Sequence, residues 1–320
     1  MEKIKKVCLL CFLFVMALAL FPVVSSMMVD GRKSTVSALV SQSSLSLRSD
    51  RLRSVTVTNP LTGDREVMSE KEYLCGIVAS QMPVDYDDEA IKAQAVASYT
   101  LMRYRRIYGT PAEAQSFVSK SELKKKWGTD YGRNYSRMKK LVNSVYGEYI
   151  AYKGAPILAA YHDFSCGVTE YGGNVWNGDY PYLVAVESRD DLCAEDYRST
   201  VRLTADEFSS VCSKKLGIVT KGKPSGWVEG CVRSNSGYVM SYTVSGCTVN
   251  GQRLRNEFGL RSACFTLKYE DNVFVFDVRG SGHGVGMSKF GANLMALNGK
   301  TYREILAHYY KGTRVIPFSK

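Results

Sequence analysis

Apolar residues recur at helical spacing where the folded part of the chain begins. The stretch Ser69–Glu72 fits a capping box, in which the Ser hydroxyl and the Glu carboxylate satisfy the first free amides of a helix. This helix must end near Gln81, because Pro83 disfavours helical geometry in the residue before it. One face of the helix is apolar: Tyr73, Leu74, Ile77 and Val78.

A second helix is predicted to begin in the acidic stretch Asp85–Glu89, where negative charge suits the positive end of the helix dipole. Gly109 and Pro111 end it. The polar stretch over 114–145 has helical character as well, and two further helices are expected over 288–297 and 302–310.

Strand patterns fill the rest of the folded part. Ser54–Thr58 alternates apolar and polar residues and leads into a turn at Asn59–Gly63. From Glu148 onward the pattern is mostly β with short turns, including a strand at Val273–Phe276. Helices at both ends of the domain around a mostly antiparallel β middle predict an α+β fold.

The N-terminus has the pattern of a targeting segment. Met1–Lys6 is basic, Val7–Val24 is apolar and about long enough to span a bilayer, and Ser25–Ser26 offers a small-residue cleavage site. We favour a membrane anchor over 1–26, with a cleaved signal as the alternative. The Ser-rich residues 27–53 are expected to form a flexible stalk, which leaves 54–320 as the domain.

Charge and cysteine usage narrow the function only a little. The formal net charge of the 320-residue chain is +11, which suits an anionic polymer such as a cell wall but also an ordinary solvated surface. The chain lacks an arginine-rich tract and zinc-finger spacing, so nucleic acid is disfavoured as a partner. Seven of the nine cysteines lie beyond the apolar N-terminal segment, at spacings unlike a disulfide framework.

Two segments have the composition of a binding site. Tyr161–Glu170 places a His, a Ser, a Cys and a Gly close together, and Val175–Leu183 adds a Trp and two Tyr. Flat rings with a few polar groups are typical of carbohydrate sites, and a polar turn beside aromatic core residues is the alternative. Arg279–Ala292 sets His283 among alternating glycines, which permit tight turns or close approach to a ligand. Ser288 is predicted to cap the helix that follows.

Taken together, these segments resemble the stage II sporulation protein D family, which includes amidase enhancers of the bacterial cell wall. The resemblance covers about residues 66 to 315 and keeps the family's order. It rests on seven stretches: Ile77–Pro83, Glu89–Ala97, Tyr161–His162, Pro181–Leu183, Leu260–Phe265, Ser281–Ser288 and Ile305–Tyr310.

The resemblance implies a lytic transglycosylase that acts on peptidoglycan glycan strands stripped of their stem peptides. In that family one Glu before Met-Pro protonates the leaving glycosidic oxygen. It then takes the proton of the C6 hydroxyl that closes a 1,6-anhydro ring, so one carboxyl group suffices. Here the position is Gln81, whose amide cannot deliver that proton. Loss of cleavage is therefore favoured, although a carboxylate among residues 85–89 is an alternative acid.

The other site residues follow from the same resemblance. His162, Ser165, Tyr182, His283 and Ser288 are expected to line the groove for the glycan, together with Lys289 where many relatives carry Gln. The family resemblance also raises zinc, for which His162, Cys166 and Cys193 are candidate ligands. Structural thiols or a Cys166–Cys193 disulfide are the favoured alternatives to a metal.

The leading hypothesis is a membrane-tethered, extracytoplasmic protein that remodels peptidoglycan during forespore engulfment in sporulation. Its expected partners are glycan strands, a cell-wall amidase and other engulfment proteins of the membrane. The rival hypotheses are a scaffold that binds peptidoglycan without cutting it, and an amidase enhancer in a wall pathway outside sporulation.

Overall fold

The computed structural model describes residues 54–58, 65–108, 116–176 and 178–317. Residues Ser54–Phe318 form a compact unit. The predicted anchor or signal, the stalk and the turn at Asn59–Gly63 lie outside the described residues, so they stay predictions. Within the described ranges, none of the helices is both long and apolar enough to span a bilayer.

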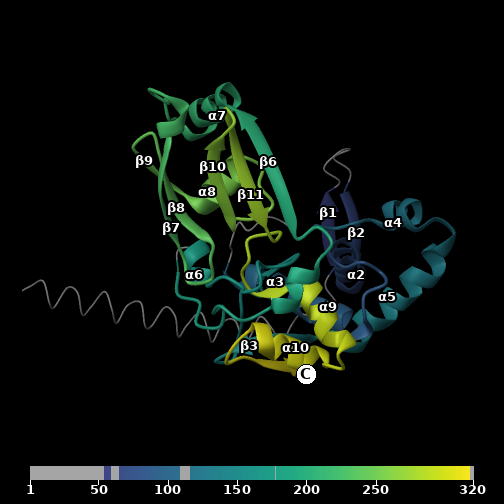
Figure 1. Ribbon diagram of the computed structural model, residues 1–320. Coiled ribbons are helices and arrows are strands. Elements are labelled where there is room, and N and C mark those ends of the chain that lie inside the picture. Colours follow the sequence, from purple (N-terminus) through teal and green to yellow (C-terminus); the bar gives the residue numbers. More distant parts are fainter. Residues whose placement is uncertain (1–53, 59–64, 109–115, 177, 318–320) are drawn as a thin grey trace, which may run out of the picture. The chain divides into compact units, whose positions relative to one another are not determined.

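The N-terminal part of the fold is a hairpin followed by four helices (Figure 1). Strands β1 (Ser54–Thr58) and β2 (Arg65–Ser69) pair antiparallel. The helices are α2 (Glu70–Gln81), α3 (Asp88–Tyr108), α4 (Lys120–Trp127) and α5 (Tyr131–Val145). Ser69 caps α2 with Glu72 in the predicted capping box, and α2 ends at Gln81 as the Pro at position 83 required.

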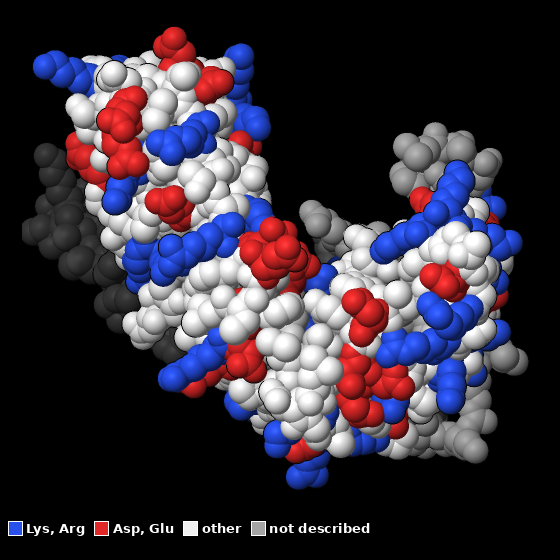
Figure 2. Space-filling model, turned by 45° about the vertical axis from the view of Figure 1, so that its right-hand side comes forward, with Lys and Arg blue, Asp and Glu red and all other residues white. Residues whose placement is uncertain are grey.

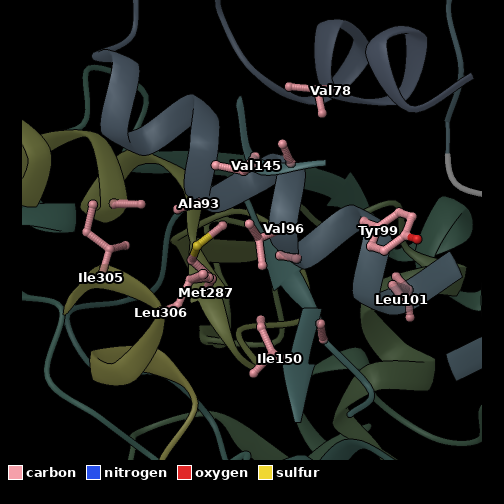
Figure 3. Packing of buried hydrophobic residues seen from close by; sticks show 14 of the residues in the cluster. Val78, Ala93, Val96, Tyr99, Leu101, Val145, Ile150, Met287, Ile305 and Leu306 are labelled. Atoms are coloured by element: carbon pink, nitrogen blue, oxygen red, sulfur yellow. The ribbon is translucent and has the colours of Figure 1, made fainter. Parts of the chain in front are cut away.

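Helix α3 is the central element of the first core. It packs against α2, α5 and strand β3 (Glu148–Tyr152), and against α9 (Lys289–Leu297) and α10 (Tyr302–Tyr309). Figure 3 shows apolar side chains of one buried cluster, nine from α2, α3, α5, β3 and α10 and one, Met287, from the segment before α9: Val78, Ala93, Val96, Tyr99, Leu101, Val145, Ile150, Met287, Ile305 and Leu306. Each fully buried aliphatic side chain of this kind stabilises the fold by about 1.5–3 kcal/mol.

Small sheets complete this core. Strand β3 lies between β13 (Arg314–Pro317) and β4 (Ala155–Pro156) in an antiparallel sheet. Strands β5 (Tyr161–His162) and β12 (Met287–Ser288) form a short parallel pair.

A second core is built from β strands and two helices. Strands β10 (Phe265–Glu270), β11 (Val273–Arg279) and β6 (Arg198–Thr204) form one antiparallel sheet. The other antiparallel sheet holds β7 (Val228–Arg233), β8 (Val239–Val244) and β9 (Cys247–Asn250). Helices α7 (Ala205–Val211) and α8 (Gly251–Glu257) cover an aromatic interior, in which the rings of Phe208 and Phe274 stack with centroids 3.9 Å apart.

The predicted α+β class and the antiparallel β middle are confirmed, with two corrections. The stretch over 114–145 is not one helix, because α4 ends at Trp127 and the following Gly128 has a φ of 52°, which an α-helix does not continue through. The β middle is interrupted by α7, α8 and the four-residue helix α6 (Gly172–Val175), which the sequence pattern missed. Short 3₁₀ segments lie at Gly128–Asp130, Arg189–Cys193 and Pro224–Gly226, and a π turn lies at Cys212–Leu216.

The positive net charge is not gathered into one patch on the face in Figure 2, where basic and acidic side chains lie next to one another. The distribution of charge on this face therefore does not indicate a binding site for a polyanion.

Candidate functional site

Gln81 is the last residue of α2 and lies at the wall of an open cleft. The backbone N–H of Met82 caps the helix by donating to Val78 O at 2.9 Å, and the chain then leaves in an extended conformation. The Gln81 side chain is half-buried. It is therefore held by the end of a packed helix while its amide can reach the cleft.

The cleft has a volume of about 660 Å³ and is lined by residues from six separate parts of the sequence. Ser80, Gln81 and Tyr86 come from the α2–α3 region, and Trp127 from the end of α4. The remaining lining residues are Met82, Pro83, Val84, Lys126, Asp163, Phe164, Ala194, Glu195, Asp196, Arg261, Lys289 and Phe290. Aromatic rings with a few charged groups are the lining that sugar-sized ligands usually meet.

Gln81 belongs to a network of polar side chains. The Lys289 ammonium donates to Gln81 Oε1 at 3.1 Å and pairs with Asp163 Oδ1 at 2.7 Å. Asp163 also accepts from Ser281 Oγ at 2.8 Å. On its other side, the Gln81 amide nitrogen donates to Ser80 Oγ at 3.3 Å. The amide is thus fixed at both ends by the protein.

Asp163 is held in its charged form. Burial raises the pKa of this carboxyl, but the Lys289 charge and the hydrogen bonds from Lys289 and Ser281 outweigh burial, so the pKa lies below its ordinary value. A carboxyl group whose pKa is lowered is ionised at neutral pH and is a poor proton donor.

The glycine-rich segment brings residues 163 and 289 together. The β5–β12 pair aligns His162 with Ser288, and Asp163 and Lys289 directly follow these two strands in the chain. Gly286 has a φ of +73°, and a Cβ there would lie 2.0 Å from Ala160 O; at Gly282, a Cβ would lie 2.6 Å from His162 Cβ. The close approach that these glycines permit is therefore between two parts of the protein itself, residues 282–286 and residues 160–162.

Ser288 and Ser165 are fully buried and support the cleft from beneath. Ser288 caps α9, as predicted: its Oγ accepts from Gly291 N at 3.0 Å and donates to Asp191 Oδ1 at 2.6 Å. The backbone N–H of Ser165 donates to the other oxygen of Asp191 at 2.7 Å. Asp191 therefore joins the start of α9 to the loop that follows Asp163.

The two histidines pack on one another behind this loop, with ring centroids 5.9 Å apart. His162 is buried, and its Nδ1 lies 3.2 Å from Val285 O, so that nitrogen carries the proton. His283 Nδ1 accepts from Val285 N at 3.0 Å, and its ring lies 5.0 Å from that of Trp176. Burial lowers the pKa of both, that of His283 to about 3, so both are neutral near pH 7.

Tyr182 belongs to the first hydrophobic core. It is buried, its hydroxyl accepts from Leu158 N at 3.2 Å, and its ring packs on Tyr152 with centroids 5.5 Å apart. Of the seven predicted site residues, the structure places Gln81 and Lys289 on the wall of this cleft. The other five lie outside its lining, so their contact with a ligand remains a prediction.

The cysteines do not gather around His162. The Cys166 thiol interacts with the thiol of Cys264 and packs near Tyr238, whereas Cys193 is exposed. All cysteines of the described ranges are free thiols, so the Cys166–Cys193 disulfide is not formed. The described residues also contain no group of three His, Cys, Asp or Glu side chains placed to hold a metal ion. His162, Cys166 and Cys193 are therefore not gathered into a ligand set among the described residues, and the zinc site stays a prediction.

Sequence reasoning missed Asp163, Trp127 and Arg261 as parts of the cleft. Asp163 stands beside His162 in a segment already identified as a candidate site, so a charged residue there was a usable signal. Arg261 likewise stands in one of the stretches that carry the family resemblance, whereas Trp127 gave no such signal, since only the folded chain brings it near Gln81.

Comparison with known proteins gives the family. The family model described as "Stage II sporulation protein" matches residues 62–152. Stage II sporulation protein D of Bacillus subtilis (strain 168) is 36% identical over 258 residues, which cover 77% of this chain and 74% of that protein. The chain belongs to the stage II sporulation protein D family.

Two further proteins are similar to this chain. Stage II sporulation protein D of Bacillus amyloliquefaciens is 34% identical over 77% of this chain and 73% of that protein. A protein named amidase enhancer from Bacillus subtilis (strain 168) is 24% identical over 77% of this chain, which covers 40% of that protein. Gln81 lies inside the residues matched by the family model.

Proposed function

We propose that this protein of the stage II sporulation protein D family binds peptidoglycan glycan strands in the cleft beside Gln81 and cleaves them slowly or not at all. The observation that carries the proposal is the amide of Gln81, fixed between Lys289 and Ser80 at the cleft wall. The family resemblance implies a Glu at this position, where one carboxyl group serves as both acid and base.

The chemistry of cleavage needs a proton that can move. The glycosidic oxygen must gain a proton as its bond to the anomeric carbon breaks, and the C6 hydroxyl must lose one as it attacks that carbon. Gln81 can do neither, and loss of general acid–base catalysis costs about 10²–10⁴-fold in rate. Asp163 is linked to Gln81 through Lys289. Its partners hold it ionised, so it does not replace a Glu at position 81 as the acid.

The cleft keeps what binding requires. Trp127, Tyr86, Phe164 and Phe290 offer rings for the apolar faces of sugar units, and Arg261 and Lys126 offer hydrogen-bond donors at the rim. Glycan strands without stem peptides carry a lactyl carboxylate on each muramic acid, and the cations of Arg261 and Lys126 can pair with these groups.

The cellular role follows from the family. We place the protein in sporulation, anchored by residues 1–26 on the outer side of a membrane, where it would hold septal wall during engulfment. The likeness to an amidase enhancer favours a cell-wall amidase as the partner that does the cutting. In that case, the protein would act as a receptor or scaffold for glycan strands.

The experiment compares the extracytoplasmic domain with its Gln81→Glu variant on purified glycan strands that have lost their stem peptides. Mass spectrometry would measure 1,6-anhydromuramyl products, and cosedimentation would measure binding. We expect both proteins to bind and the natural chain to form at least about 100-fold less product than a competent acid–base enzyme.

The carboxylates exposed in the same cleft supply the control. Glu195→Gln and Asp196→Asn should leave any residual product unchanged. Rapid product formation by the natural chain, at a rate near that of a competent acid–base enzyme, would show that the protein cleaves glycan and that the binding proposal is wrong. Loss of product in either control variant would identify a substitute acid.

A further inference from the structure

We propose that Lys289 is a positioning residue that makes position 81 a fixed hydrogen-bond donor toward the bound sugar, and that the same ammonium would prevent a carboxyl group at position 81 from acting as an acid. The inference rests on the proposed function, since it concerns the same cleft. It adds how position 81 contacts the ligand and why a carboxylate restored there would not suffice.

The orientation of the Gln81 amide follows from what lysine can do. An ammonium group has three donors and no acceptor, so the atom of Gln81 that faces it at 3.1 Å must be the oxygen. The amide nitrogen then points to the opposite side, where one of its N–H groups donates to Ser80 Oγ at 3.3 Å. Ser80 Oγ is itself held in place, because it lies 2.7 Å from Ile77 O and 2.6 Å from Ser116 O and donates its single proton to one of them.

The second N–H of the amide is left to the cleft. Among the described residues, Ser80 is the acceptor that Nε2 meets, and Gln81 lies in the cleft wall. A ligand therefore meets a donor with a fixed direction. The groups that match it are neutral oxygen acceptors, such as the acetamido carbonyl or a ring or glycosidic oxygen of an N-acetylated sugar.

Lys289 is rigid enough to impose this orientation. Its side chain is 12% exposed, and its ammonium also pairs with Asp163 Oδ1 at 2.7 Å. Asp163 is held in turn by Ser281 Oγ, and its backbone carbonyl accepts from Phe290 N at 3.0 Å. Lys289 is also the first residue of α9, so the positive end of that helix dipole lies near it.

The same contacts oppose acid catalysis at position 81. A carboxyl oxygen in the place of Gln81 Oε1 would lie next to the ammonium, which favours the ionised form and removes the proton that the leaving glycosidic oxygen needs. Each tenfold decrease in the protonated fraction lowers the rate of a general acid about tenfold. A carboxyl group at this position therefore becomes useful when the charge on residue 289 is removed.

The test is a set of variants in the extracytoplasmic domain assayed on denuded glycan strands: Gln81→Glu, Gln81→Glu with Lys289→Gln, and Gln81→Glu with Lys289→Arg. We expect the variant with Lys289→Gln to form anhydromuramyl product at least about tenfold faster than Gln81→Glu alone. The variant with Lys289→Arg keeps the charge and should stay as slow as Gln81→Glu. If Lys289 served folding alone, the variant with Lys289→Arg would be the faster of the two, since Arg resembles Lys more than Gln does.

Binding of glycan strands gives a second test of the role of Lys289. With Gln81 in place, Lys289→Met should weaken cosedimentation with glycan strands about tenfold or more, whereas Lys289→Arg should retain it. The exposed Lys268 of β10 gives the matched control, because Lys268→Gln removes a positive charge outside the cleft lining. Circular dichroism of each variant shows that it is folded.

The outcomes separate this inference from the proposed function. Equal rates for Gln81→Glu and its Lys289→Gln derivative would overturn the role of Lys289 and leave the proposed function intact. A folded derivative that binds glycan and still forms no product would overturn it as well. Rapid product formation by the natural chain would instead overturn the proposed function.

Discussion

An amide at position 81 keeps the shape of a glutamate side chain and lacks its exchangeable proton. The change is small in volume, so α2, its end at Met82 and the cleft wall need no adjustment to accept it. Because shape is kept, we expect binding to survive where catalysis does not. At the scale of one residue, recognition and cleavage of the glycan are thus separable.

The ion pair beside Gln81 predicts how stability depends on pH. The pKa of Asp163 lies below its ordinary value of 3.8, because the Lys289 charge and two hydrogen bonds outweigh burial. A carboxyl group with a lowered folded pKa stabilises the fold above its unfolded pKa, and this stability is lost as the pH falls through the folded pKa. We expect Asp163→Asn to lower the free energy of unfolding by about 1 kcal/mol at pH 7.

Urea denaturation measures the effect, and the difference between the natural chain and Asp163→Asn is the quantity to follow. It should shrink below about pH 4 and vanish once Asp163 is protonated in both states. Asp206→Asn on the exposed start of α7 serves as the control for acids that titrate in solvent. A difference that grows toward acid pH would contradict the sign of the shift.

At the scale of elements, the start of α9 is the part most sensitive to a single substitution. Ser288→Ala removes both the helix cap and the hydrogen bond to the buried Asp191 carboxylate. The cap contributes about 1 kcal/mol and a bond to a charged group about 1.5–3 kcal/mol, so a loss of about 3 kcal/mol is expected.

Thr301→Ala is the matched comparison. Thr301 caps α10 through an exposed capping box, so its loss should cost about 1 kcal/mol. Thermal or urea unfolding of the two variants gives both values. Equal losses would mean that the Asp191 contact adds nothing to the cap.

Sequence predicted those elements whose signals are local. The ends of α2 and α3 are set by Pro83 and by the Gly109–Pro111 breakers, and the caps at Ser69 and Ser288 can be read from neighbouring residues. The break between α4 and α5 was missed, because a single Gly at position 128 does not by itself end a helix.

The site was predictable in part for the same reason. Gln81 and Lys289 were identified through motifs, and both line the cleft. Asp163 and Asp191 were not identified, because their roles come from contacts with residues 289 and 288, far along the chain. Burial of Ser165 and Tyr182 could not be read from a polar turn or from an aromatic pair.

At the scale of the whole molecule, the location of the protein is open to a direct test. Residues 1–26 lie outside the described structure, and their basic and apolar pattern predicts an anchor. We expect the full chain to sediment with membranes and to be released by detergent but not by high salt. Salt matters here, because the net charge of +11 alone could hold the domain to an anionic surface.

A chain that begins at residue 54 is the control and should stay in the soluble fraction. If the full chain is released with a new N-terminus near Ser26, the segment is a cleaved signal and the anchor prediction is wrong. Mass spectrometry of the N-terminal peptide distinguishes the two.

The contact between Gln81 and Lys289 also affects when, during synthesis and folding, the cleft can form. The two residues are 208 positions apart in sequence, and the pair Tyr161–Met287 of β5 and β12 also joins parts of the chain that are far apart. Closing so long a loop is entropically costly and slow compared with forming α2 or α3. Because the chain is synthesised from its N-terminus, Gln81 is made long before Lys289, the residue that orients its amide. The cleft beside Gln81 is therefore completed only after residue 289 has been made and has folded against the earlier part of the chain.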